Sequence, residues 1–131
     1  MFHIAKGEFI AKLAPRPMDG QPAELKIGRM SIDKTLSGDL VATTVGQMLS
    51  AMTEVKGSAG YVAIERVDGT LFGKRGTFLL QHHGMMNRGV PSLSVTVVPD
   101  SGTGELVGIT GEFTIIIANG KHSYEFKYTL P

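Results

Sequence analysis

Three residues of one stretch, Tyr61, Glu65 and His82, carry side chains that can exchange protons or bind a polar ligand. Alternation along a strand puts Glu65 on the same face as Tyr61 and the small side chain of Ala63. A carboxylate in an apolar cavity is desolvated, which we expect to raise its pKa and to suit it to proton transfer or to binding a hydroxyl or amine. His82 falls on the same predicted face and is the candidate acid-base partner. The candidate catalytic residues are therefore Glu65 and His82.

Both residues also have a structural interpretation. Glu65 can pair with Lys74 or with another buried cation, since structural ion pairs perturb pKa values as well. A histidine near the end of a strand is often satisfied by backbone groups or by water. The sequence leaves both interpretations open.

The other candidate ligand contacts are apolar. Phe78 and Leu80 share the predicted face of Glu65, and seven methionines, Met48 among them, suit an adaptable pocket or ordinary core filling. The predicted ligand-binding residues are Tyr61, Met48, Glu65, Phe78, Leu80 and His82.

The histidines do not predict a metal site. His82 and His83 point to opposite faces of one strand, and His3 and His122 lie far from them with no ligand spacing. The chain has no cysteine, which excludes disulfides, thiolate metal sites and thiol catalysis. We expect neither a metal nor a cofactor.

These candidates lie on two predicted strands between Tyr61 and His83, joined by a two-residue turn at Asp68-Gly69. This turn sets Glu65 opposite Phe72, Val67 opposite Thr70 and Ala63 opposite Lys74. The face predicted to line the interior carries Tyr61, Ala63, Glu65, Val67, Phe72, Lys74, Phe78, Leu80 and His82. The opposite face, predicted to meet a second layer or a neighbouring subunit, carries Val62, Ile64, Arg66, Leu71, Arg75, Leu79, Gln81 and His83.

The rest of the chain reads as further strands separated by turn residues. Strands are predicted at residues 2–13, 25–36, 40–53 and 91–99, with a break at Pro15 to Pro22 and a loop at residues 84–89. Asn119-Gly120 predicts a final hairpin, with Ile117 opposite His122 and Phe113 opposite Phe126. Near Gly104 we expect a tight turn with one turn of helix.

About eight strands without an amphipathic helix favour closure, because a closed sheet has no exposed edges. An eight-stranded barrel has room inside for side chains or one small ligand. We therefore predict an all-β protein, a single domain of residues 1–131 folded as a closed eight-stranded antiparallel β-barrel. A two-layer sandwich is the main alternative.

Charge and hydropathy exclude several classes of partner. The chain has 13 basic and 12 acidic residues, which argues against nucleic-acid binding through phosphate charge. No apolar run is long enough for a membrane helix, and the first residues do not form a signal sequence. A cytoplasmic protein without nucleic-acid or membrane partners is expected.

Several motifs resemble one family. They are the segment SGTGELVGITGEF at residues 101–113, Tyr61-x-Ala63-x-Glu65, Gly76-Thr-Phe with Gln81-His82, and the run Lys121 to Tyr124. The chain is similar to the allene-oxide-cyclase-like (calycin-like) barrels, above all to small bacterial relatives of unknown function. The resemblance implies an eight-stranded antiparallel barrel and, from the plant branches, a homo-oligomer built on the outer barrel wall. It implies no known reaction.

Three functions are compatible with the predicted barrel. The first is binding of a small apolar or amphipathic ligand in the barrel cavity, with Tyr61, Glu65 and His82 as its few polar groups. The second is a cofactor-independent isomerase or cyclase that uses Glu65 as general acid-base. The third is a structural module with a filled barrel and an apolar outer wall that makes an oligomer. The sequence does not distinguish binding from catalysis.

Overall fold

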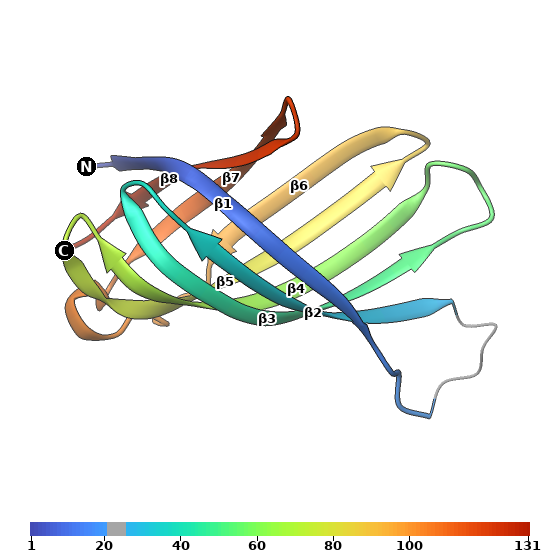
Figure 1. Cartoon of the computed structure of the whole chain (residues 1–131), viewed down its shortest axis with the longest axis horizontal. Coiled ribbons are helices and arrows are strands. Elements are labelled where there is room, and N and C mark those ends of the chain that lie inside the picture. The colour runs from blue at the N-terminus through green and yellow to red at the C-terminus, as the bar shows by residue number, and fades with distance from the viewer. Residues whose placement is uncertain (21–25) are drawn as a thin grey trace.

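The computed structural model describes residues 1–20 and 26–131. Eight strands within these residues form a closed antiparallel barrel, in which each strand pairs with its neighbours in sequence and β1 pairs with β8 (Figure 1). The strands are β1 (His3–Arg16), β2 (Ile27–Leu36), β3 (Leu40–Met52), β4 (Ala59–Leu71), β5 (Lys74–Asn87), β6 (Val90–Val97), β7 (Thr110–Ala118) and β8 (Lys121–Thr129). The predicted barrel is confirmed and the sandwich is excluded. The predicted features at Pro22 and Leu25 lie outside the described residues.

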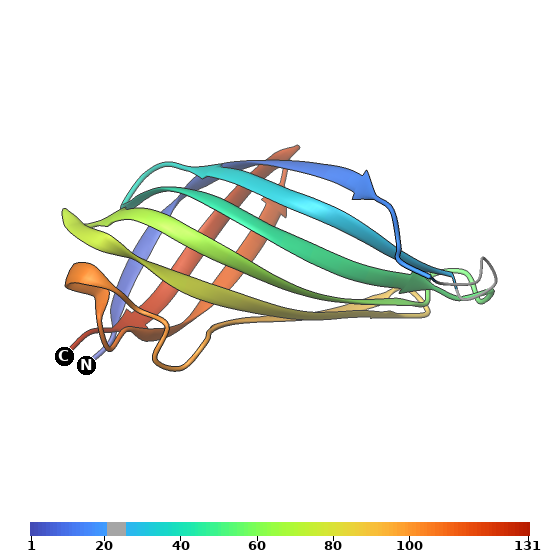
Figure 2. The same cartoon turned by 90° about the horizontal axis from the view of Figure 1, so that it is seen from below.

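The barrel has a closed half and an open half. In the closed half β1 pairs with β8 through His3 to Phe9, and beyond Phe9 it pairs with β2 instead. Across the described residues β6 and β7 share one pair, Thr96 with Glu112. The long strands therefore run past the β7–β8 hairpin as a curved sheet open on one side (Figure 2). We call this sheet the open half; it comprises residues 10–16, 27–33, 45–52, 59–64, 81–87 and 90–95.

The closed half is filled by packed aromatic and aliphatic side chains. Phe78 stacks on Phe126 with ring centroids 5.5 Å apart. Leu106, in a short 3-10 helix at Gly104–Leu106, is fully buried. The segment before β7 also reaches β5, because Thr103 N–H donates to the Thr77 carbonyl at 2.8 Å. This glycine-rich segment, residues 101–109, thus packs against β5. The expected helical turn near Gly104 is confirmed.

The turn of the central hairpin lies at Phe72-Gly73, so the predicted turn at Asp68-Gly69 is wrong. Phe72 and Gly73 have φ angles of 47° and 81°, and β4 continues to Leu71. Gly69 is needed for close packing rather than for turning, since a Cβ there would lie 2.1 Å from the carbonyl oxygen of Val41. Leu71 was predicted to face outward. Because β4 continues to Leu71, alternation turns its side chain inward, where it joins the core.

The observed turn changes the cross-strand pairs but keeps the predicted faces of residues 61–67 and 78–83. Glu65 lies opposite Leu80 instead of Phe72, Val67 opposite Phe78 and Ala63 opposite His82. The partner of Glu65 moves by eight positions, an even number, and alternation has a period of two, so the same side chains still share a face. Phe72 and Lys74, predicted to point inward, are exposed at the turn.

Two predicted breaks are in part strand in the structure: β1 ends at Arg16, and the described residues 17–20 are not strand. β5 continues through the predicted loop at residues 84–89 as far as Asn87 and turns at Arg88-Gly89. β1 continues through Pro15, which is tolerated because proline can occupy an edge strand and β1 pairs there with β2 alone among the described strands. The hairpin at Asn119-Gly120 is confirmed, with the predicted pairs.

The outer wall of β3 and β4 is apolar and exposed. Val45, Val62 and Ile64 are 66%, 50% and 51% exposed in the single chain. A homo-oligomer built on this wall stays a prediction. Among the described residues no helix is long and apolar enough to cross a membrane.

Candidate functional site

A buried polar cluster lies where the two halves of the barrel meet. Four adjacent strands, β2 to β5, each supply one inward side chain: Lys34, Thr44, Glu65 and His82, which are 8%, 2%, 1% and 3% exposed. Strand register brings them together, because Lys34 of β2 is paired with Thr44 of β3, and Glu65 of β4 is paired with Gly46 of β3. The cluster is therefore a product of the sheet and not of a loop.

The Glu65 carboxylate is the centre of this cluster. Its Oε1 accepts hydrogen bonds from His82 Nε2 at 2.8 Å and from Lys34 Nζ at 3.1 Å, and its Oε2 accepts one from Thr44 Oγ1 at 2.9 Å. Burial alone raises the pKa of Glu65, but His82 and Lys34, through their hydrogen bonds and charge, together outweigh burial, so the pKa is lowered. The expected rise in this pKa is wrong, because the sequence did not reveal which donors face the acid. Glu65 is a carboxylate at neutral pH.

His82 connects Glu65 to Tyr61. Its Nδ1 lies 3.3 Å from the Tyr61 hydroxyl oxygen. Burial first, and then the nearby charge of Glu65, raise the pKa of Tyr61, so the phenol stays protonated at neutral pH. The result is a continuous chain from the Lys34 ammonium through Glu65 and His82 to a half-buried phenol.

Two glycines make room for the acid and the phenol. A Cβ on Gly84 would lie 2.2 Å from the Tyr61 ring, which shows that the ring lies across its cross-strand partner. A Cβ on Gly46 would lie 2.6 Å from Cα and Cβ of Glu65. Larger residues at these positions therefore displace Tyr61 or Glu65.

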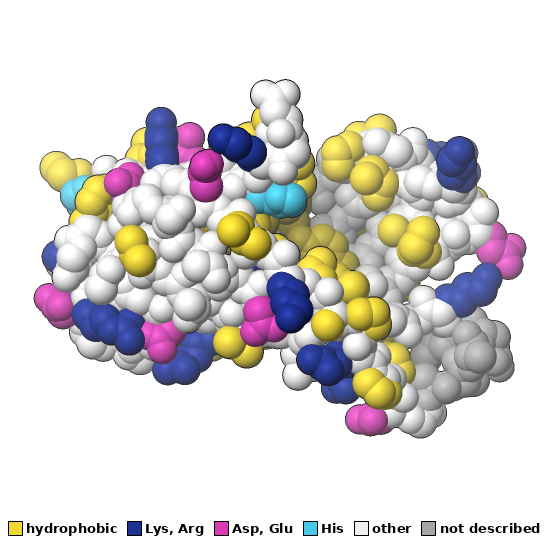
Figure 3. Space-filling view, viewed as in Figure 1, with side chains coloured by type: hydrophobic (Ala, Val, Ile, Leu, Met, Phe, Trp, Pro, Cys, Tyr) yellow, Lys and Arg dark blue, Asp and Glu magenta, His cyan; other side chains and the backbone are white. Residues whose placement is uncertain are grey.

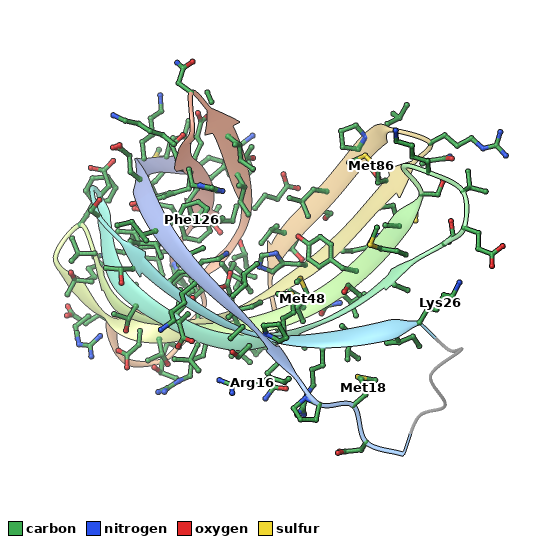
Figure 4. The ribbon with its side chains drawn as sticks, turned by 45° about the vertical axis from the view of Figure 1, so that its right-hand side comes forward. Arg16, Met18, Lys26, Met48, Met86 and Phe126 are labelled. Carbon is green, nitrogen blue, oxygen red and sulfur yellow. The ribbon has the colours of Figure 1, made fainter. Side chains whose placement is uncertain are left out.

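The structure divides the predicted ligand-binding residues between the two halves. Tyr61, Glu65 and His82 meet as expected, whereas Phe78 and Leu80 are buried in the core of the closed half. Met48 lies in the open half, beside Ala63 and Met30 on neighbouring strands. Figure 4 shows Met48 and Met86 along the long sheet and Phe126 in the packed part. Their roles in ligand binding stay predictions.

The open half presents an apolar concave face next to Tyr61. Strand alternation puts Leu13, Met30, Met48, Met86 and Leu93 on its inner side. A groove of about 190 Å³ runs between β6 and β7, and Figure 3 shows the surface hollowed there, with hydrophobic side chains inside. The groove is lined by Leu93, Ser94, Val95, Glu112, Phe113, Thr114 and Ile115.

The sequence interpretation missed Lys34, Thr44, Gly46 and Gly84. Lys34 had a usable signal, since it occupies the middle of Ile32-x-Lys34-x-Leu36, a charged residue on an apolar face. Gly46 and Gly84 had no such signal in the sequence, because their roles depend on the strand register. Lys74, named as one partner for Glu65, is exposed, and Lys34 is the buried cation.

No metal-binding group emerges from residues 1–20 and 26–131, where no three His, Asp or Glu side chains are arranged to hold an ion. His82 is buried in the cluster, while His83 on the opposite face is exposed.

Fold and site together define a small antiparallel β-barrel with a buried Lys–Glu–His–Tyr chain at the floor of an open half. The chain belongs to the family described as "Protein of unknown function (DUF3224)", whose model matches residues 5–128. It is similar to a crystal structure of a protein with unknown function from the same family in Shewanella oneidensis MR-1. The two are 47% identical, with a TM-score of 0.93 over 100% of this chain and 98% of that chain. No curated protein matches the chain.

Proposed function

We propose that the barrel binds a small apolar or amphipathic molecule in its open half, with Tyr61 as the polar group that orients it and His82 as the group that holds Tyr61. The observation that carries this proposal is the buried chain from Lys34 to Tyr61, which ends at a half-buried phenol beside an apolar concave face. Ligand sites typically combine an apolar lining with a few fixed polar groups. The buried ion pair holds the His82 ring, and through it the phenol, in one place.

Glu65 acts in this proposal as a positioning residue. Its carboxylate is almost fully buried and already accepts three hydrogen bonds, so a ligand in the open half meets Tyr61 first. The same geometry is the basis of the alternative, an isomerase or cyclase without a cofactor. There Tyr61 and His82 would move the proton and Glu65 would orient His82, an arrangement suited to general acid-base chemistry.

A structural module, the third candidate, draws support from the filled closed half and from the apolar outer wall. A relation to the allene-oxide-cyclase-like barrels is a further proposal, supported by the order of the eight described strands and by the glycine-rich segment that closes one end of the barrel.

The binding proposal is tested with N-phenyl-1-naphthylamine, a neutral dye whose emission rises in apolar surroundings. The wild-type protein should bind the dye, and Met48→Lys, which puts a charge on the concave face, should weaken binding at least roughly tenfold. Val45→Lys is the matched control, since Val45 lies on the outer side of the same strand and is exposed. Absence of dye binding, or equal loss in both variants, would contradict the proposal.

The catalytic alternative needs its own assay. Turnover of an unsaturated epoxide, lost in both His82→Gln and Tyr61→Phe, would establish it. Dye binding without turnover would support the binding proposal and count against catalysis.

A further inference from the structure

The proton positions in the cluster follow from its donors and acceptors. Glu65, as a carboxylate, can accept hydrogen bonds but not donate them, so the His82 nitrogen that faces it, Nε2, carries a proton. A neutral imidazole has one ring proton, which leaves Nδ1 as an acceptor. The Tyr61 hydroxyl, 3.3 Å from Nδ1, donates its single proton there. The oxygen of Tyr61 therefore offers lone pairs, and no proton, to the open half.

The buried ion pair of the cluster has no net charge to offer a ligand. The charges of the Lys34 ammonium and the Glu65 carboxylate cancel at a separation of 3.1 Å.

The concave face has no counter-ion for a charged ligand either. Among the described inward positions of the open half, none is Lys, Arg, Asp or Glu, and apart from Tyr61 and the cluster residue His82 the larger side chains are methionine, leucine and isoleucine. A carboxylate or ammonium placed there would lose its hydration without a partner. The inner side of the open half therefore disfavours ions of either sign, and Glu112, which lines the groove between β6 and β7, is an exposed residue of β7 outside this inner side.

From these observations we infer that the ligand is an uncharged apolar molecule bearing an O–H or N–H group, such as an alcohol or phenol, which donates a hydrogen bond to the Tyr61 oxygen. This inference rests on the proposed function and adds the chemical class of the ligand. It predicts weaker binding of neutral molecules whose one polar group is an acceptor, and the weakest binding of carboxylates.

The test compares three probes of one shape: 2-naphthol, its methyl ether and 2-naphthoate, each measured by displacement of N-phenyl-1-naphthylamine. The naphthol should bind roughly 2- to 10-fold tighter than the ether, the range that one neutral hydrogen bond supplies, and the naphthoate should bind weakest. In Tyr61→Phe the ratio should fall to about one, with the affinity for the ether unchanged. Tyr128→Phe, a buried tyrosine of the closed half, should keep the wild-type ratio.

The possible results separate a failure of this inference from a failure of the proposed function. Equal affinity for the naphthol and the ether in the wild-type protein, or tightest binding of the naphthoate, overturns this inference and leaves the proposed function standing. Binding of neither neutral probe overturns the proposed function and the inference with it. Nitrogen-15 NMR of the wild-type imidazoles needs no variant of Tyr61: the Nε2–H tautomer of His82 is expected, and the Nδ1–H tautomer contradicts the inference.

Discussion

Replacing Lys34 by methionine tests whether the polar cluster is one buried electrostatic unit. The change keeps a long side chain beside Phe9 but removes the ammonium 3.1 Å from Glu65. Removing one partner of a buried ion pair typically costs about 3–5 kcal/mol, because the remaining charge is left uncompensated. We expect about 3 kcal/mol here, since His82 and Thr44 still donate to the carboxylate. That is a large part of the roughly 5–15 kcal/mol that stabilises a typical domain.

The assay is urea unfolding followed by far-ultraviolet circular dichroism at neutral pH. The double variant Lys34→Met with Glu65→Gln should recover to within about 1 kcal/mol of the wild type, because no unpaired charge remains. Lys74→Met, at an exposed lysine, is the control and should change the free energy of unfolding by less than about 0.5 kcal/mol. A loss below about 1 kcal/mol for Lys34→Met, or no recovery in the double variant, would refute the reasoning.

Three other consequences are open to direct measurement. The lowered pKa of Glu65 stabilises the fold above the ordinary value of 4.5 and loses this contribution as the pH falls through the folded-state value, so Glu65→Gln should flatten the acid side of the stability profile; identical acid profiles would argue against the ion pair. Gly84→Val should push the Tyr61 ring off β5, costing about 1–3 kcal/mol and the preference for the naphthol over its ether; an unchanged preference would mean that Gly84 does not position the phenol. Ile64→Lys should reduce the mass in analytical ultracentrifugation if the outer wall joins copies of the chain, and equal masses for variant and wild type would count against that interface.

Local turn chemistry explains which hairpin the sequence predicts correctly. Asn119-Gly120 turns as expected because nothing else competes for these residues, and a Cβ on Gly120 would meet no atom within 4 Å. Gly69 sits against the backbone of β3, so a tertiary contact determines its role. Such a contact is invisible to turn propensity.

The site was predictable as far as alternation alone determines it. Tyr61, Glu65 and His82 share a face in any register displaced by an even number of residues, so the misplaced turn did no harm to their grouping. Lys34 and Thr44 depend on the register between β2 and β3, which the connection at residues 37–39 sets and the sequence pattern did not reveal. The direction of the Glu65 pKa depends on those same two strands.

The sequence also did not predict at which level along the barrel axis each inward residue lies. Phe78 and Leu80 lie on the predicted face, yet they are buried because β8 and the segment before β7 pack over that level. Met48, on the same inner surface, lies where β7 and β8 have ended. Which inward residues line an open space therefore follows from strand lengths, and these are set by pairing between distant segments.

A crystal structure of the protein with 2-naphthol tests the central claim most directly. The account predicts the ring against Met48 in the open half, with its hydroxyl within about 3 Å of the Tyr61 oxygen. A naphthol bound on the outer wall of β3 and β4, or one whose hydroxyl points away from Tyr61, would contradict it.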